Sequence, residues 1–157
     1  MKRETLFLKA VVLLMGISVL APAVFWLPRL AVDMAEMYPE FAYLRYPILI
    51  GLYITVIPYF IALQQTFKLL IHIDGNNAFT EFSVNALNNI RHCAVAISIS
   101  YIVGVVFLFS QNALHPGVAI IGFTIILASA AIAVFAAVLQ KLLKNAIAIK
   151  TENDLTV

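Results

Sequence analysis

The sequence predicts an all-α integral membrane protein, an antiparallel bundle of four helices in which the third and fourth extend into the cytosol. Three observations support this fold class. Hydrophobic residues make up 63% of the 157-residue chain and charged residues only 11%, whereas soluble domains carry about 25% charged residues. The chain contains three long runs without Asp, Glu, Lys or Arg. Each run could cross a bilayer core of about 30 Å, which needs about 20 apolar residues in a helix.

The first two runs provide one span each. Residues 10–28 hold nineteen uncharged residues and residues 46–67 hold twenty-two. The first run has an alternative interpretation, because the charged residues before it are typical of a secretory signal peptide and Ala21-Pro22-Ala23 is similar to a cleavage site. The apolar run continues past that motif, which favours an uncleaved span. The other three spans keep the same orientation in either case.

The third run, residues 92–140, holds forty-nine uncharged residues and is long enough for two spans. Its middle, residues 111–117, gathers Gln, Asn, His, Pro and Gly, which are the residue types that end helices and form turns. We therefore expect spans at 93–110 and 117–139. The short loop between them makes these two helices antiparallel neighbours, and all four spans form one domain covering residues 1–157.

Small residues indicate how the last two spans pack. Within lipid, close packing of small side chains and hydrogen bonds between helices hold helices together. The third span carries Ser100 and Gly104 four residues apart, and the fourth carries Ser129, Ala133 and Ala137 at the same spacing. We expect these two faces to meet.

Basic residues predict the orientation of the spans, because cytosolic segments of membrane proteins are enriched in Lys and Arg. The outer loop, residues 29–45, holds two basic residues, Arg29 and Arg45. The N-terminus, the inner loop (residues 68–92) and the tail (residues 140–157) hold the other eight: Lys2, Arg3, Lys9, Lys68, Arg91, Lys141, Lys144 and Lys150. Both termini are therefore expected in the cytosol.

The inner loop and the tail both contain helical patterns beyond the membrane. Asp-Gly-Asn-Asn at residues 74–77 is typical of a turn, after which Thr80 predicts an N-cap and Glu81 the first residue of the third helix. The tail has an apolar stripe between lysines that extends the fourth helix. The two extensions are expected to form a small cytosolic platform. Alternatively, the lysines of the tail anchor it to anionic lipid.

The outer loop predicts a short helix on the membrane surface, interrupted near Pro39. Asp33, Glu36 and Glu40 fall together on its polar face. Such a face can receive a cation or a basic peptide, and it is also what a helix simply facing water would present.

The sequence indicates no catalytic or cofactor chemistry. Cys93 is the only cysteine, which excludes an internal disulfide and a cysteine-built metal site. His72, His92 and His115 are interpreted as interfacial side chains rather than metal or haem ligands. The net charge of +2 does not favour direct binding of nucleic acid. No charged residue lies in the middle of a span, which argues against an ion-coupled transporter.

The two inner segments resemble a known family. The residues Ile73-Asp74-Gly75, Ala78-Phe79-Thr80, Asn85-Ala86-Leu87 and Ile90, with the ending Glu152-Asn153-Asp154-Leu155-Thr156-Val157, are similar to the YoaS-like family of bacterial membrane proteins, a family of unknown function. The resemblance implies four spans and no established catalytic residues. Members are often encoded beside a small helix-turn-helix regulator, which implies a candidate cytosolic partner.

These observations favour a non-enzymatic inner-membrane protein that modulates a cytosolic partner such as a transcription regulator. The candidate partner-binding residues lie in the two inner segments: Asp74, Phe79, Thr80, Glu81, Asn85, Asp154 and Leu155. One alternative is self-protection against a membrane-active peptide, with Asp33, Glu36 and Glu40 as the site that binds the peptide. A small transporter is another. The bilayer is the expected environment, no cofactor is expected, and homo-oligomerisation is left open.

Overall fold

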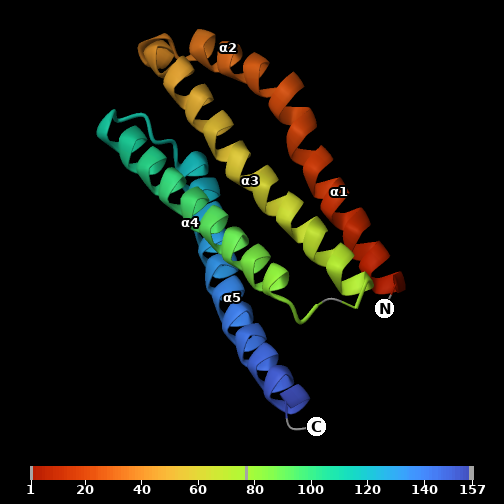
Figure 1. Cartoon of the computed structure of the whole chain (residues 1–157). Helices are drawn as coiled ribbons and strands as arrows, with labels where there is room; N and C mark the ends of the chain where they lie inside the picture. The colour runs from red at the N-terminus through yellow and green to blue at the C-terminus, as the bar shows by residue number, and fades with distance from the viewer. Residues whose placement is uncertain (1, 77, 156–157) are drawn as a thin grey trace.

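The computed structural model of the chain describes residues 2–76 and 78–155. Met1, Asn77 of the expected turn, and Thr156 and Val157 of the expected tail lie outside the described residues. The described chain is helical, without strands (Figure 1). Its elements in order are α1 (Lys2–Phe25), α2 (Leu27–Met37), the 3-10 helix η1 (Pro39–Leu44), α3 (Arg45–Asp74), α4 (Glu81–Ser110) and α5 (Pro116–Leu155).

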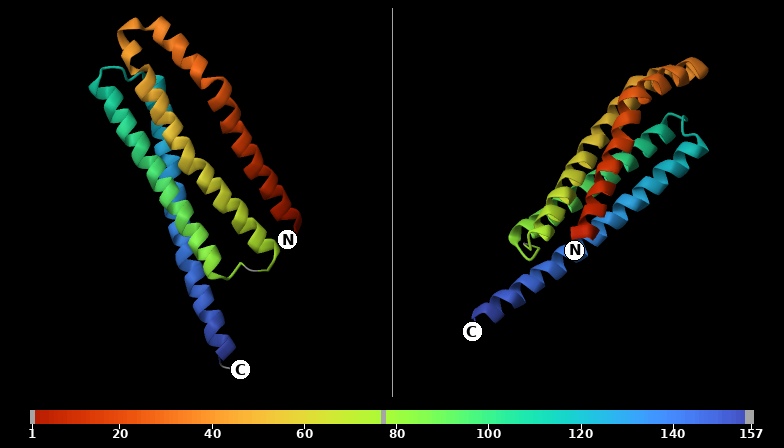
Figure 2. Two further views of the ribbon diagram at one scale, coloured as in Figure 1. Left: turned by 45° about the horizontal axis from the view of Figure 1, so that its top comes forward. Right: turned by 90° about the vertical axis from the view of Figure 1, so that its right-hand side faces the viewer.

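Four helical segments are long and apolar enough to cross a membrane, as the sequence predicts: α1, η1 continued by α3, α4 and α5. The helices pack in the order α1, α3, α4 and α5, each antiparallel to the one before it (Figure 2). Within the described chain, the backbone of α1 approaches neither α4 nor α5. The bundle is therefore open along one side.

The first span ends where the chain bends at Trp26, between α1 and α2 (Figure 1). Pro28 has no backbone N–H to donate to the carbonyl four residues earlier. That carbonyl belongs to Val24, and the hydroxyl of Tyr53 in α3 donates to the adjacent carbonyl of Ala23, at 2.7 Å. Tyr59 donates to the carbonyl of Met15 at 3.1 Å. Two tyrosines of α3 thus hold α1 along its length, and Ala23, in the alternative cleavage motif, is buried.

Helices α3 and α4 keep a constant register over their whole length. Tyr43, just before α3, donates to Gln111 Oε1 at 2.8 Å, and Asn89 donates to Gln65 Oε1 at 3.3 Å. The ring of His72 stacks on that of Phe82, with centroids 3.8 Å apart. From one pair to the next, the number of residues advanced along α3 equals the number of residues moved back along α4. The end of α3 therefore lies level with the start of α4.

Helices α4 and α5 meet through small and hydroxyl side chains. The Oγ atoms of Ser98 and Ser129 are 2.7 Å apart, and a Cβ at Gly122 would lie 3.0 Å from Val105 Cγ2. Ser129 and Ala133 face α4 as expected, since both are buried. The expected face on α4 is wrong, because a Cβ at Gly104 would meet nothing within 4 Å.

The best-buried part of the molecule lies at the start of α4, outside the expected span. Ser83, Val84, Ala86 and Leu87 are at most 8% exposed, whereas Val103, deeper in the span, is 61% exposed. Lipid solvates apolar side chains, so burial of apolar surface is required only where the chain meets water. This contrast is the one expected of a helix whose start lies in water, and α4 begins at Glu81, as the sequence predicts.

Candidate functional site

The candidate site is the inner end of the helices, where the sequence places the cytosol. Three helices begin or end there, with α3 between the other two: α1 begins, α3 ends and α4 begins (Figure 1). We use the name inner platform for residues 2–9, 68–92 and 140–155. The α4–α5 register set by Ser98 and Ser129 places Glu81 level with residue 146 of α5. Residues 147–155 therefore continue past the other helices by about 13 Å at 1.5 Å per residue.

A polar clasp joins α1 to α3 at the platform. Lys9 Nζ lies 2.6 Å from Asp74 Oδ2, and the hydroxyl of Thr5 donates to Asp74 Oδ1. Both charged side chains are shielded, with 22% of Lys9 and 20% of Asp74 exposed. Hydrogen bonds from Lys9 and then Thr5 lower the pKa of the Asp74 carboxyl, against a smaller opposing effect of desolvation. Asp74 is thus a charged structural anchor within the chain.

The other candidate residues of the inner loop lie around the start of α4. Thr80 occupies the N-cap position with an extended backbone, and its carbonyl accepts from the N–H groups of Ser83 and Val84 at 3.1 and 3.3 Å. Glu81 is exposed in the first turn, where a carboxylate is favourable. Asn85 is exposed, and Phe79 is 53% exposed. This group therefore presents a mixed apolar and polar edge to water.

Asp154 and Leu155 are not brought to that edge. Both lie at the end of α5 and are exposed, Leu155 at 82%. They stand about eight residues beyond the level of Glu81, which is about 12 Å along the helix. The two groups of candidate residues are therefore separate parts of the inner platform.

Sequence reasoning missed the residues that hold the platform together. Lys9 and Thr5 of α1 anchor Asp74, and His72 pairs with Phe82 across α3 and α4. Their positions in the sequence could have indicated this pair, because Lys9 directly precedes the first apolar run and Asp74 follows the second span. In antiparallel neighbours such residues lie at the same end, so a cross-helix pair was a testable expectation.

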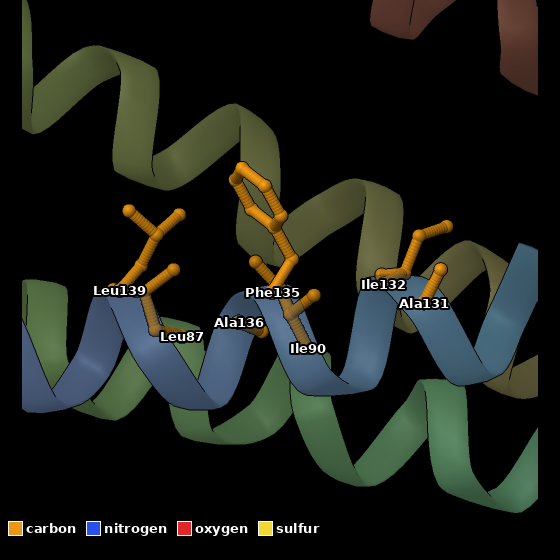
Figure 3. Close-up of a pocket in the computed structure, with 7 residues that line it drawn as sticks. All are labelled: Leu87, Ile90, Ala131, Ile132, Phe135, Ala136 and Leu139. Carbon is orange, nitrogen blue, oxygen red and sulfur yellow. The ribbon is translucent and has the colours of Figure 1, made fainter.

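An apolar groove runs along the seam between α4 and α5 beside the platform (Figure 3). It has a volume of about 290 Å³. Its lining consists of side chains from both helices: Leu87, Ile90, Ala131, Ile132, Phe135, Ala136 and Leu139. All of these side chains are hydrocarbons, so the groove could hold an apolar group but has no side-chain hydrogen-bond donor or acceptor to recognise a polar one.

The histidines do not form a metal site in the described structure. His72 stacks on Phe82, whereas Nδ1 of His92 lies 2.7 Å from the carbonyl oxygen of Asn88. Among residues 2–76 and 78–155, no group of three or more His, Cys, Asp and Glu side chains could hold a metal ion.

The outer acidic residues lie at the opposite end of the bundle. Asp33 and Glu36 belong to α2, and Glu40 belongs to η1. All three are exposed. Helix α2 ends at Met37, before Pro39 as the sequence predicts. Nearby, the guanidinium of Arg45 lies over the ring of Tyr46, 4.8 Å from its centroid.

Comparison with known proteins gives two similarities. A family described as "Protein of unknown function (DUF2975)" matches residues 29–157. The chain is 52% identical to "Uncharacterized membrane protein YoaS" of Bacillus subtilis (strain 168), over 99% of both chains. No solved structure matches. The first of the two similarities begins at the start of the outer segment and includes the whole of α3, α4 and α5.

Proposed function

The chain belongs to the DUF2975 family of proteins of unknown function, and from that premise we propose that it is a non-enzymatic membrane protein that holds a cytosolic partner at its inner platform. The observation that carries the proposal is the length of α5. This helix has 40 residues, and its last nine stand beyond the ends of the other helices. A helix that leaves its own bundle has surface for another protein to contact.

The contacts within the platform support a binding role. The Lys9–Asp74 pair and the stacked rings of His72 and Phe82 join neighbouring helices to each other. Phe79 and the end of α5 remain exposed beside this support. An exposed apolar patch marks a site for a protein partner only where it is contiguous, and the end of α5 offers such a surface in Leu142 and Ile149.

The partner is proposed to be a cytosolic protein, with a helix-turn-helix transcription regulator as the first class to examine. That choice rests on the resemblance of the inner segments to the YoaS-like family. In this proposal the membrane protein regulates by retaining its partner at the inner membrane. The chain itself makes no direct contact with nucleic acid.

Crosslinking and affinity capture from native membranes test the proposal. The tag is placed at the N-terminus so that the end of α5 stays free, and the full chain is compared with a chain lacking residues 150–157. We expect a specific cytosolic protein with the full chain and its loss with the truncated chain. A matched control, Asp33→Asn with Glu36→Gln at the outer end, retains capture. Equal capture by the truncated chain would refute the role of α5.

A second candidate function is protection against a membrane-active basic peptide. It is favoured by the exposure of Asp33, Glu36 and Glu40 on one short outer segment. Neutralising all three is expected to remove protection of cells that express the chain, while truncation of α5 leaves it unchanged. If expression never protects cells, this candidate is wrong.

A further inference from the structure

The end of α5 carries an apolar stripe whose two large side chains are exposed in the described part of the chain. Leu142, Ala146 and Ile149 recur at steps of four and three residues, which places them on one helical face. Leu142 is 59% exposed and Ile149 is 67% exposed. The expected fourth span ends at residue 139, so the stripe begins about 4 Å beyond that level at Leu142 and reaches about 15 Å beyond it at Ile149.

Basic residues flank the stripe. At 100° per residue, Lys141 lies on one side of it and Lys150 on the other, with Lys144 behind. All three lysines are exposed. No acidic residue occurs between residues 140 and 150, and the acidic residues of this helix end come only afterwards, at Glu152 and Asp154. The stripe therefore has a positively charged border over most of its length.

The distance from the membrane favours a protein over lipid as the occupant. Lys150 lies eleven residues past Leu139, or about 16 Å along the helix. Charges in physiological salt are screened beyond about 8 Å. Figure 1 shows α5 continuing past the other helices in its own direction instead of folding back along them. Because the headgroup layer extends about 5–8 Å beyond the hydrocarbon core, Lys150 lies outside it by about one screening length, whereas Lys141 and Lys144 lie near its level.

We propose that the end of α5 binds an amphipathic helix of its partner whose apolar face is bordered by acidic residues. This inference rests on the proposed function and names the chemistry of the partner. The two apolar stripes pack against each other as in other helix–helix recognition. Carboxylates on the partner pair with Lys141 and Lys150, which selects acidic helices and rejects basic ones.

Two synthetic peptides and the full chain in nanodiscs of zwitterionic lipid test this inference. Both peptides carry the same Leu and Ala face, with Glu at all bordering positions in one and Lys in the other. Fluorescence anisotropy is expected to show roughly tenfold tighter binding of the Glu peptide, since attraction replaces repulsion at exposed ion pairs. The triple variant Lys141→Gln, Lys144→Gln, Lys150→Gln brings the two affinities together.

Substitutions that leave the net charge unchanged test the contribution of the apolar stripe separately from that of the lysines. Leu142→Asn with Ile149→Asn removes binding of the Glu peptide, whereas Ala148→Asn, on the other side of the same helix, retains it. All three sites are exposed, so circular dichroism is expected to stay unchanged. Equal binding of the two peptides, or binding of neither, overturns the inference. So does loss of binding when anionic lipid enters the nanodiscs, because the lysines would then engage the bilayer.

Failure here is distinguishable from failure of the proposed function. If the peptides do not discriminate but truncation still removes the captured cytosolic protein, the platform binds a partner of another chemistry. If truncation leaves capture unchanged, the role of α5 itself is wrong.

Discussion

Lys9 and Asp74, 65 positions apart in the chain, form an ion pair of 2.6 Å that fixes the start of α1 to the end of α3. Lys9 directly precedes the first expected span, whereas Asp74 lies seven residues beyond the end of the second, about 10 Å along α3. Its neighbour Thr5 donates a further hydrogen bond to the same carboxylate. Because α1 packs only on α3 among the long helices of the described chain, this contact is central to keeping the first span in the bundle.

Removing either charge of the clasp is expected to lower the thermal stability of the protein. Asp74→Asn and Lys9→Met each lower Tm by about 2–4 °C, the range that a modest loss of stability produces in a chain of this size. The double variant falls little further, because the partner has already been removed. Thermal unfolding in detergent measures all three. Additive losses would show that the two side chains act independently.

The pH dependence of this contribution follows from the lowered pKa of Asp74. A carboxyl with a lower pKa in the folded state stabilises the fold above its ordinary value of 3.8 and loses that contribution as the pH falls through the folded pKa. The Tm difference between the natural chain and Asp74→Asn is therefore expected to be constant between about pH 5 and pH 8 and to shrink below about pH 4. A difference that changes near neutral pH would implicate another group.

Two glycines provide a matched test of the α4–α5 interface. A Cβ at Gly122 would lie 3.0 Å from Val105, whereas one at Gly104 would meet nothing within 4 Å. Gly122→Leu is expected to destabilise the chain by about 1–3 kcal/mol through overpacking. Gly104→Leu is expected to be neutral or slightly stabilising, because Leu favours helix more than Gly does. Chemical unfolding of both variants in the same detergent decides the comparison, and equal effects would contradict this interface.

Tyr53 is expected to contribute by satisfying the Ala23 carbonyl near the bend between α1 and α2. Tyr53→Phe keeps the ring and removes one hydrogen bond, at a cost of about 1 kcal/mol. Tyr101→Phe is the control, because the hydroxyl of Tyr101 makes no hydrogen bond with the described residues. If both variants unfold alike, the bond to Ala23 contributes nothing measurable.

The sequence predicted the helices better than their contacts, and the reason is physical. Spans follow from charge-free runs, and the start of α4 follows from the turn before Thr80, because these are local properties. The face of a membrane helix is not local: in an apolar run, hydropathy does not distinguish Ser98, which contacts Ser129, from Ser100. The choice between them depends on the relative rotation of α4 and α5.

The same limitation applies to the candidate site. Asp74 is a candidate partner-binding residue by its place in the inner loop, but its carboxylate is held by Lys9 and Thr5. That pairing depends on where the start of α1 lies relative to the end of α3. The sequence predicts this relative position only to within a turn or two of helix. The exposed positions, such as Phe79 and Leu155, were easier to identify because they follow from the ends of helices.

A cytosolic partner at the inner platform requires that the end of α5 faces the cytosol. The natural Cys93 is first replaced by Ala, and single cysteines are then placed by Asp33→Cys at the outer end and Thr151→Cys on α5. Both sites are exposed. Intact cells are treated with a membrane-impermeant maleimide. We expect direct labelling at position 33. Position 151 is expected to be labelled only after the membrane is opened, because eight of the ten basic residues lie on the side of the membrane where α5 ends. Direct labelling at position 151 would place the inner platform outside the cell and refute a cytosolic partner.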